Sequence, residues 1–197
     1  MKAIVTSGIV VAFLVLSISA GQFVGAAERI DVVFASVLPP SGSGWTQVRE
    51  HPGKVSLGKR GAASGQSFVG TVVLVRLPAL KSKEEFFALV SRQRARDSND
   101  TRFEDLIRDE TVSVQDGVWV VRFHMKYKDF GATNRPKTAP YLIVEEFGAV
   151  FRHPFENGVA VHVALSQRSL PQDLDETFEK VAEDFLGSVQ FRSVPIR

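Results

Sequence analysis

The sequence predicts an α+β domain in which helices flank a mainly antiparallel β-sheet. Three observations lead to this prediction: runs of β-branched residues bounded by Gly and Pro, turns of the Asn-Gly and Asp-Gly type, and two segments whose apolar residues recur at helical spacing. Along the chain the order is strands, helix, several strands, helix, strand. This order is typical of an antiparallel sheet covered by helices and not of alternating βα units.

The first 27 residues have the layout of a secretory signal peptide. Lys2 is their only charged residue, residues 9–18 are almost all apolar, and small residues precede Glu28. We expect cleavage after Ala27 or one residue earlier, and therefore a periplasmic or secreted protein with no stable membrane span. The alternative is an uncleaved anchor, because the uncharged stretch is long enough to cross a bilayer.

Composition excludes several classes of function. Removal of residues 1–27 would leave 170 residues with 23 basic and 22 acidic side chains, a net charge of +1. This balance gives no electrostatic reason to expect nucleic-acid binding. The absence of cysteine excludes disulfides, thiolate metal sites, lipid attachment and a cysteine nucleophile. An exported protein without disulfides fits a bacterial periplasm or exterior.

After the signal peptide, the chain is expected to begin with an irregular lead-in and to continue as one domain. Residues 28–53 include a stretch rich in Pro, Gly and Ser, with Trp45 as its expected anchor. Residues 54–197 are predicted to form the single α+β domain. Its first two strands are expected at 54–60 and 66–77, since the second is rich in β-branched residues and stops at a proline.

A helix is predicted over residues 83–96. Ser82 and Glu85 form a capping box, in which each side chain can accept a hydrogen bond from a free backbone N–H of the first turn. Three arginines close the helix: Arg92, Arg94 and Arg96. We interpret them as a solvated helix end, favoured by the negative pole of the helix dipole, and not as an anion site.

The clearest hairpin surrounds Asp116-Gly117. This pair suits a two-residue type I′ turn, because both central positions need positive φ. In the resulting register Val112 faces Val121, so turn chemistry and hydrophobic matching agree. On the other side of the same strands, Asp109 faces His124.

A second pair of strands is predicted at 141–151 and 159–167, after a long polar loop over 129–140. A two-residue turn at Asn157-Gly158 would place Pro154 in a hydrogen-bonded pair, although proline has no N–H. It would also set the phenylalanines of one strand opposite small and polar residues of the next. We therefore predict a turn one or three residues longer, which matches phenylalanine with valine.

This register separates the two histidines that flank the turn. It sends His153 and His162 to opposite faces of the sheet. His153 is expected at the surface or in the turn, whereas His162 is expected to be covered and hydrogen-bonded. Small residues lie beside His162 on its face: Gly148, Ala160 and Ala164. They predict that a helix lies close over this face.

The C-terminal part is predicted as a helix followed by a short strand. Asp173 and Glu176 form a second capping signature, Gly187 stands where a C-terminal cap would be, and the apolar residues between them recur at helical spacing. Residues 188–194 are expected to form the last strand.

Three short stretches resemble the PsbP-like family of small exported bacterial proteins: Gly44-Trp45, Ser82 to Phe86, and Phe185 to Phe191. The resemblance covers residues 45–193. It implies an α/β/α sandwich and an accessory or binding domain more than an enzyme. It carries over no functional residue.

Asp109 and His124 are the best candidates for catalysis, since a carboxylate can fix the tautomer of an imidazole and raise its basicity. The alternative is a simple cross-strand stabilising pair. The sequence contains no Gly-x-Ser-x-Gly elbow that would supply a nucleophile. Glu145 and Glu146 should point to opposite faces of their strand, so they cannot act as one acid/base pair.

Metal binding has weaker support. His124, His153 and His162 are the candidate ligands, and no cofactor is expected. The acidic run before the hairpin does not fit an EF-hand, because Arg102 stands where Gly is needed and Arg108 where the bidentate Glu should be.

The leading functional hypothesis is a non-catalytic exported domain. It would bind a protein or a cell-envelope component through the 129–140 loop and the lead-in before residue 54. The alternatives are a hydrolase that uses Asp109 and His124, and a histidine-based metal-binding protein.

Overall fold

The structure is a computed structural model that describes residues 22–23, 28–96 and 101–193. Its strands are β1 (Gln22–Phe23), β2 (Ile30–Val32), β3 (Ala35–Val37), β4 (Thr46–His51), β5 (Lys54–Arg60), β6 (Ser67–Arg76), β7 (Phe103–Gln115), β8 (Val118–Asp129), β9 (Leu142–Arg152), β10 (Val159–Ser169) and β11 (Gln190–Phe191). Its helices are α1 (Lys83–Arg96), the short 3₁₀ helix η1 (Pro171–Asp173) and α2 (Phe178–Gly187). The predicted signal peptide lies outside the described residues, apart from the two residues of β1.

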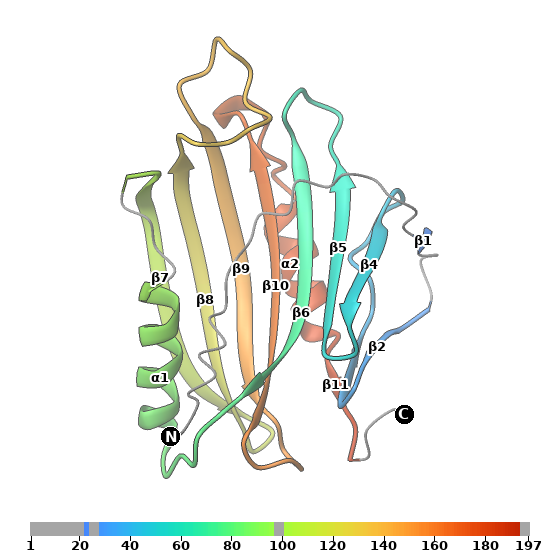
Figure 1. Cartoon of the computed structure of the whole chain (residues 1–197), viewed down its shortest axis with the longest axis vertical. Coiled ribbons are helices and arrows are strands. Elements are labelled where there is room, and N and C mark those ends of the chain that lie inside the picture. Colours follow the sequence, from blue (N-terminus) through green and yellow to red (C-terminus); the bar gives the residue numbers. More distant parts are fainter. Residues whose placement is uncertain (1–21, 24–27, 97–100, 194–197) are drawn as a thin grey trace, which may run out of the picture.

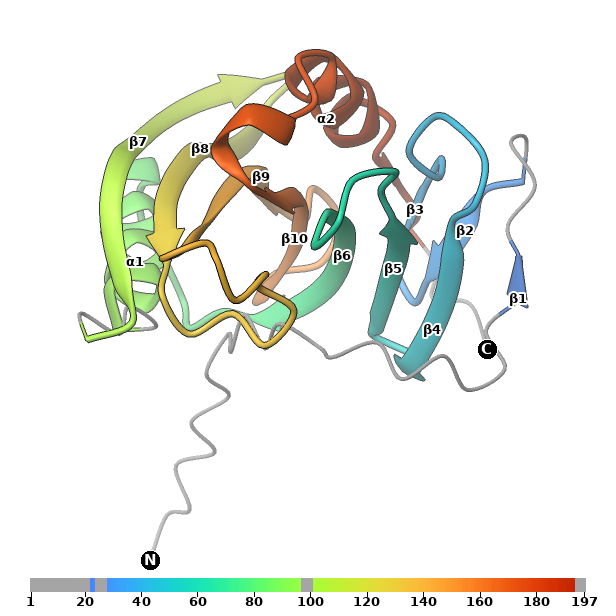
Figure 2. The ribbon, with the colours of Figure 1, turned by 90° about the horizontal axis from the view of Figure 1, so that it is seen from above.

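Two antiparallel sheets build the fold. The eight-stranded sheet has the order β1-β4-β5-β6-β10-β9-β8-β7, and the three-stranded sheet has the order β11-β3-β2. Helices α1 and α2 lie on opposite faces of the large, curved sheet (Figures 1 and 2). We call these faces the α1 face and the α2 face. The predicted fold class, an antiparallel sheet flanked by helices, is confirmed.

Each face of the large sheet has its own core, because successive side chains of a strand point to opposite faces. On the α2 face, Phe178 and Phe185 of α2 pack against the central strands and against Val37 of the small sheet. On the α1 face, Phe86 and Val90 of α1 form a smaller cluster with residues of β8, β9 and β10. Helix α2 therefore sits over the larger core, and α1 over the smaller one.

The Asp116-Gly117 hairpin has the predicted geometry. Asp116 has φ 48° and Gly117 has φ 79°, as a type I′ turn requires. Val112 pairs with Val121, and Asp109 lies opposite His124. The predicted register is confirmed.

The turn between β9 and β10 is longer than Asn-Gly, as the sequence predicted. Phe151 pairs with Val161, and Phe147 pairs with Leu165. The N–H of His153 donates to the carbonyl of Val159 at 2.9 Å, so that Pro154 lies in the loop, where its missing N–H costs nothing.

The prediction of an irregular lead-in over residues 28–53 is wrong, because β2, β3 and β4 lie within it. Thr46 of β4 pairs with Gly58 of β5, and Trp45, only 3% exposed, anchors the segment as predicted. Strands β2 and β3 have three residues each, too few to show a period in the sequence. The last strand, β11, joins β3 in the small sheet.

Helix α2 begins later than predicted. Asp173 closes η1 instead of capping α2, because the chain after it is extended at Leu174. Thr177 is the N-cap of α2 and makes no side-chain capping hydrogen bond. The carboxylate of Asp175 accepts the Thr177 N–H at 2.9 Å in an Asx turn just before the helix. At the other end, Gly187 is the last helical residue and Ser188 is the C-cap in a right-handed conformation.

Phe123, and not a helix, fills the space over Gly148. A β-carbon on Gly148 would lie 2.1 Å from Cζ of Phe123. The guanidinium of Arg94 lies 3.2 Å from the centre of the same ring on α1's side. The small residues of β9 and β10 therefore make room for an aromatic ring from the neighbouring strand.

We expect Gly148→Ala to lower the free energy of unfolding by about 2 kcal/mol, because the added methyl group overpacks a buried ring that has no room to move. Gly187→Ala is the matched control, since nothing lies within 4 Å of its β-carbon position; it should be neutral or stabilise the helix by up to about 1 kcal/mol. Urea denaturation of both variants measures the difference. Equal stability of the two variants would contradict this packing.

Candidate functional site

Four segments meet at one end of the large sheet, at the top of Figure 1. They are residues 38–45, the β5–β6 loop (61–66), the β8–β9 loop (130–141) and the connector from β10 to α2 (170–177). We call this region the loop end. The β5–β6 loop packs on the β8–β9 loop, since a β-carbon on Gly65 would lie 3.2 Å from the carbonyl oxygen of Asn134. Of the two segments that the sequence predicted as a binding surface, the 129–140 loop lies at this end; of the lead-in before residue 54, only the stretch before β4 reaches it, and the rest forms β2, β3 and β4.

The buried carboxylate of Asp129 joins three segments of the chain at this end of the sheet. Asp129 is fully buried, and Arg102 binds both of its oxygens, at 2.7 and 2.8 Å. Arg168 Nη2 lies 3.0 Å from Oδ2, and the N–H of Gly131 donates to Oδ1 at 3.0 Å. One carboxylate thus joins the starts of β7 and of the β8–β9 loop to the end of β10.

The two arginines respond differently to this carboxylate. The hydrogen bond to Asp129 raises the pKa of Arg102. Burial lowers the pKa of Arg168, although the nearby Asp129 opposes the effect. Two guanidinium groups thus share the carboxylate of Asp129.

A depression of about 670 Å³ opens on the α2 face of the sheet, between the β5–β6 loop and the connector before α2. Lys59 and Arg60 line one side of it, and Asp173 and Asp175 line the other. The amide of Gln66 donates to the carbonyl of Asp173 at 2.8 Å and so ties the two sides together. Among the described residues, no ion pair joins the cations of one side to the carboxylates of the other.

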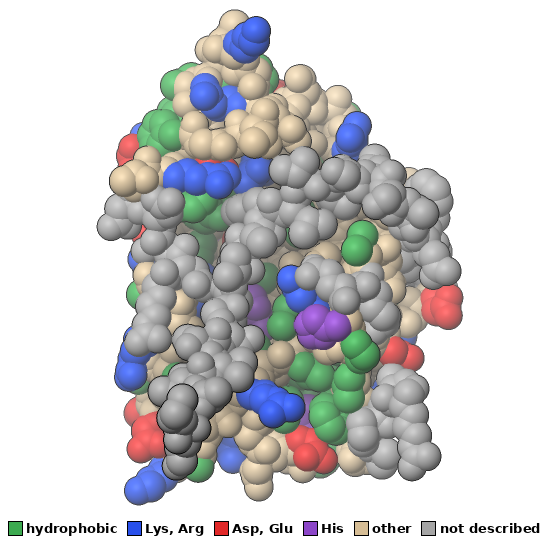
Figure 3. Space-filling view, in the orientation of Figure 1, with side chains coloured by type: hydrophobic (Ala, Val, Ile, Leu, Met, Phe, Trp, Pro, Cys, Tyr) green, Lys and Arg blue, Asp and Glu red, His purple; other side chains and the backbone are tan. Residues whose placement is uncertain are grey.

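At the loop end, the cationic and the acidic side chains lie on different segments of the chain. Residues 59–66 and 130–141 carry four cationic side chains and no carboxylate: Lys59, Arg60, Arg135 and Lys137. The connector 170–177 carries three carboxylates and no cation. Figure 3 shows lysine and arginine side chains gathered at this end. A ligand that carries an anionic group would find unpaired cations here.

The structure places the predicted pair Asp109 and His124 opposite each other but joins them by no hydrogen bond among the described residues. Nε2 of His124 lies 3.1 Å from Oε1 of Glu145, and the ring stacks on Phe147 with centroids 4.1 Å apart. Glu145 also accepts from Lys126 at 3.3 Å. Asp109 is exposed on the edge strand. The carboxylate partner of the imidazole is therefore Glu145, on the α2 face.

His153 lies on the opposite face from His162, as predicted, but it is not at the surface. Its ring is 3% exposed, and Nδ1 accepts the N–H groups of Phe155 and Glu156 at 3.2 and 3.0 Å. Nε2 then carries the proton and donates to the carbonyl of Phe34 at 3.2 Å. Of the two predicted locations, the surface is wrong, because the small sheet covers this end of β9, whereas the turn is right: His153 is the first residue of the loop between β9 and β10.

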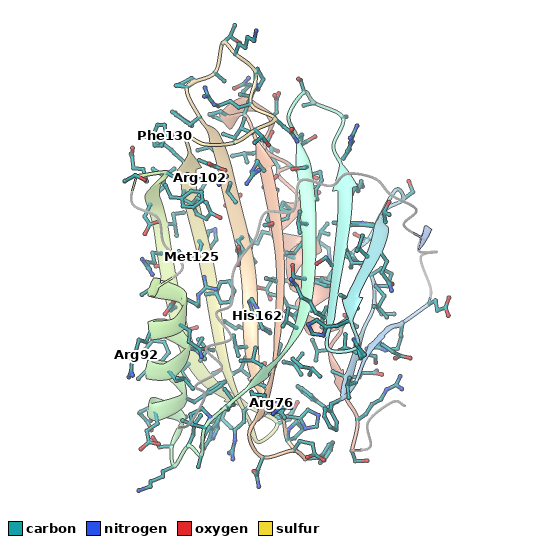
Figure 4. All side chains as sticks on the ribbon, viewed as in Figure 1. Arg76, Arg92, Arg102, Met125, Phe130 and His162 are labelled. Atoms are coloured by element: carbon teal, nitrogen blue, oxygen red, sulfur yellow. The ribbon has the colours of Figure 1, made fainter. Side chains whose placement is uncertain are left out.

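His162 is covered as predicted, but the predicted hydrogen bonds are absent. It is 3% exposed, and neither ring nitrogen has a partner among the described residues. Burial, with a smaller contribution from Arg94, lowers its pKa to about 3. Figure 4 shows His162 near the middle of the sheet, far from Arg102 and Phe130 at the loop end. The three candidate histidines thus lie apart, and no group of three possible ligands of the His, Asp or Glu type gathers in the described part of the chain.

A charged cluster that the sequence did not reveal holds α1 on the sheet. Arg94, interpreted from the sequence as part of a solvated helix end, has a side chain that is only 10% exposed: its Nε lies 3.1 Å from Glu110 and its Nη1 lies 3.9 Å from Glu146. Ser91 donates to Glu110 at 2.5 Å. Burial raises the pKa of Glu146, and Arg94 opposes the effect. The helical spacing of Ser91 and Arg94 beside Val90 was the only signal that this side of the helix faces the sheet.

Comparisons with known proteins show the fold. Neither a family model nor a curated protein matches the sequence. Among solved structures, the chain is similar to cyanobacterial PsbP (CyanoP) from Synechocystis sp. PCC 6803, with 12% sequence identity, a TM-score of 0.50, and coverage of 89% of this chain and 95% of the other. The chain has a PsbP-like fold. The predicted resemblance is confirmed at the level of architecture. None of the helices in the described ranges has the length and apolar character of a membrane span.

The lowered pKa of His162 makes stability depend on pH. Between pH 6.5 and about 3 the unfolded chain binds a proton at this residue that the folded chain does not, so the free energy of unfolding falls as the pH falls. We expect His162→Leu to remove this loss, which amounts to about 1.4 kcal/mol per pH unit in the middle of the window. Chemical denaturation at a series of pH values compares the two slopes. An identical slope in the wild type and the variant would contradict a neutral, buried imidazole.

Proposed function

We propose that this chain is an exported, non-catalytic accessory domain that binds a partner protein through its loop end. The observation that carries the proposal is the depression at this end, where cations on one side and carboxylates on the other are not paired with each other. Unpaired charges around a concave surface favour a partner that supplies the missing counter-charges, because complementary charge steers encounter and fixes orientation.

The loop end also has features of an interaction surface beyond its charge. Phe130, on the β8–β9 loop, is 41% exposed. Phe130 packs edge-on against Tyr141, over which Lys128 lies at 5.2 Å. Exposed apolar groups beside cations are common at protein-binding sites.

Localisation follows from the sequence and belongs to the same proposal. A signal peptide at residues 1–27 and a chain without cysteine favour the bacterial periplasm or the cell exterior. The partner would then be a protein of the envelope or one that is itself exported.

We expect an acidic probe to bind the loop end of the mature chain. The probe is a decamer of glutamate, acetylated and amidated so that only its side chains carry charge. Amide NMR shifts should change in residues 59–66 and 130–141, and binding should weaken several-fold when salt rises from about 50 to 250 mM, because exposed ion pairs are screened. The double substitution Lys59→Gln with Arg60→Gln should abolish most of the effect.

The control for this experiment removes charge elsewhere. Lys83→Gln with Lys180→Gln changes the net charge by the same amount, at two exposed positions on α1 and α2 whose partners are Glu84 and Asp184. This variant should bind as the wild type does. Equal loss in both double variants, or no binding to the wild type at low salt, would contradict the proposal.

A further inference from the structure

The depression at the loop end continues into a smaller, more enclosed notch of about 40 Å³. Lys59, Phe68 and Asp175 line both the depression and the notch. The other walls of the notch are largely apolar: Trp45, Leu165, Phe178 and Val181. The notch has room for roughly one group the size of a methyl group or a water molecule, and its apolar walls favour the methyl group.

The ammonium group of Lys59 marks the junction between the two spaces. Its Nζ lies 5.9 Å from the ring centres of both Trp45 and Phe68. No carboxylate of the described residues pairs with it. Asp175, the nearest acidic wall residue of the notch, already accepts hydrogen bonds from the N–H and the hydroxyl of Thr177, at 2.9 and 2.7 Å. The cation is therefore available to an anion from outside.

We propose that the notch and the depression together bind the carboxyl terminus of a partner chain that ends in alanine. The methyl side chain enters the notch, the terminal carboxylate pairs with Lys59, and the preceding residues extend across the depression. This proposal rests on the proposed function and names the part of the partner that the loop end recognises.

A chain terminus fits better than an internal acidic residue. In a C-terminal alanine the methyl group and the carboxylate are attached to the same Cα atom, so both fall within the small distance that separates the notch from the Lys59 ammonium. An internal aspartate or glutamate would place its carboxylate on one residue and the apolar group on another. The opposite side of the depression, with Asp173, suits a basic or amide group further back in the same peptide.

Tryptophan NMR tests this inference directly. The chain has two tryptophans, Trp45 at the notch and Trp119, which packs against Phe86 on the α1 face. The indole N–H of Trp45 donates to the carbonyl of Ser41 at 3.2 Å, and its resonance reports on the notch. The probe is acetyl-Gly-Ser-Gly-Ala, prepared as the free acid and as the C-terminal amide; Trp45→Phe assigns the signals.

We expect the free acid to shift the Trp45 indole resonance in a saturable way and to leave that of Trp119 unchanged. The amide, and a free acid that ends in phenylalanine, should each bind at least about tenfold more weakly, because each loses either the charge or the fit. Lys59→Met should abolish the response, whereas Lys180→Met should not.

Equal binding of the acid and the amide, or no shift of the Trp45 resonance by either, would overturn the inference. The blocked glutamate decamer separates this failure from a failure of the proposed function, because it has no free carboxyl terminus. If the decamer binds and the tetrapeptide acid does not, the loop end binds an acidic partner in another way. If neither binds, both proposals fail.

Discussion

The carboxylate of Asp129 is buried at the end of β8, and its neutralisation by Arg102 and Arg168 is the constraint on which the loop end depends. A buried carboxylate is strongly unfavourable unless charged and polar groups compensate it. Here the compensation comes from the starts of β7 and of the β8–β9 loop and from the end of β10, so three strands must end at one place. The cluster lies on the α1 face of the large sheet and the depression on the α2 face, and none of the three cluster residues lines the depression.

A second charged cluster, between α1 and the sheet, has the opposite ratio of charges, with one cation for two carboxylates. A single guanidinium, that of Arg94, serves both Glu110 and Glu146 and also covers the ring of Phe123. Only a few apolar side chains attach α1 to the sheet, so these ion pairs and the stacking on Phe123 supply much of the contact. His162, beneath the same ring, remains neutral without a hydrogen-bonding partner. An unsatisfied buried polar group of this kind costs about 1 to 3 kcal/mol, and the close packing of the neighbouring strands offsets that cost.

Most of the fold could be predicted from local chemistry. The Asp116-Gly117 turn determines the β7–β8 register. For β9 and β10, Pro154 excludes the two-residue turn and the matching of phenylalanine with valine selects the faces, although two turn lengths remained possible. The helix over residues 83–96 follows from its capping box and its spacing. Three-residue strands and the start of α2 could not be predicted, since the former are too short to show a period and the latter depends on an Asx turn at Asp175. The candidate site was predicted only as a region. Both the ion cluster around Asp129 and the notch at Lys59 bring together residues that are more than 60 positions apart in the sequence, such as Arg102 with Arg168 and Lys59 with Phe178. No local sequence pattern links residues at such separations.

The measurement that tests this account most directly is amide hydrogen exchange of the mature chain with the substitution Asp129→Asn. The asparagine keeps the shape of the side chain but removes the charge that balances Arg102 and Arg168. We expect the amides of residues 101–104 and 130–141 to lose protection while those in the middle of β9 and β10 keep it, and we expect Asp105→Asn, in an exposed pair with Arg108, to change neither group. Unchanged protection at the loop end in the Asp129→Asn variant, or a uniform loss across the whole sheet, would contradict the central role of this carboxylate.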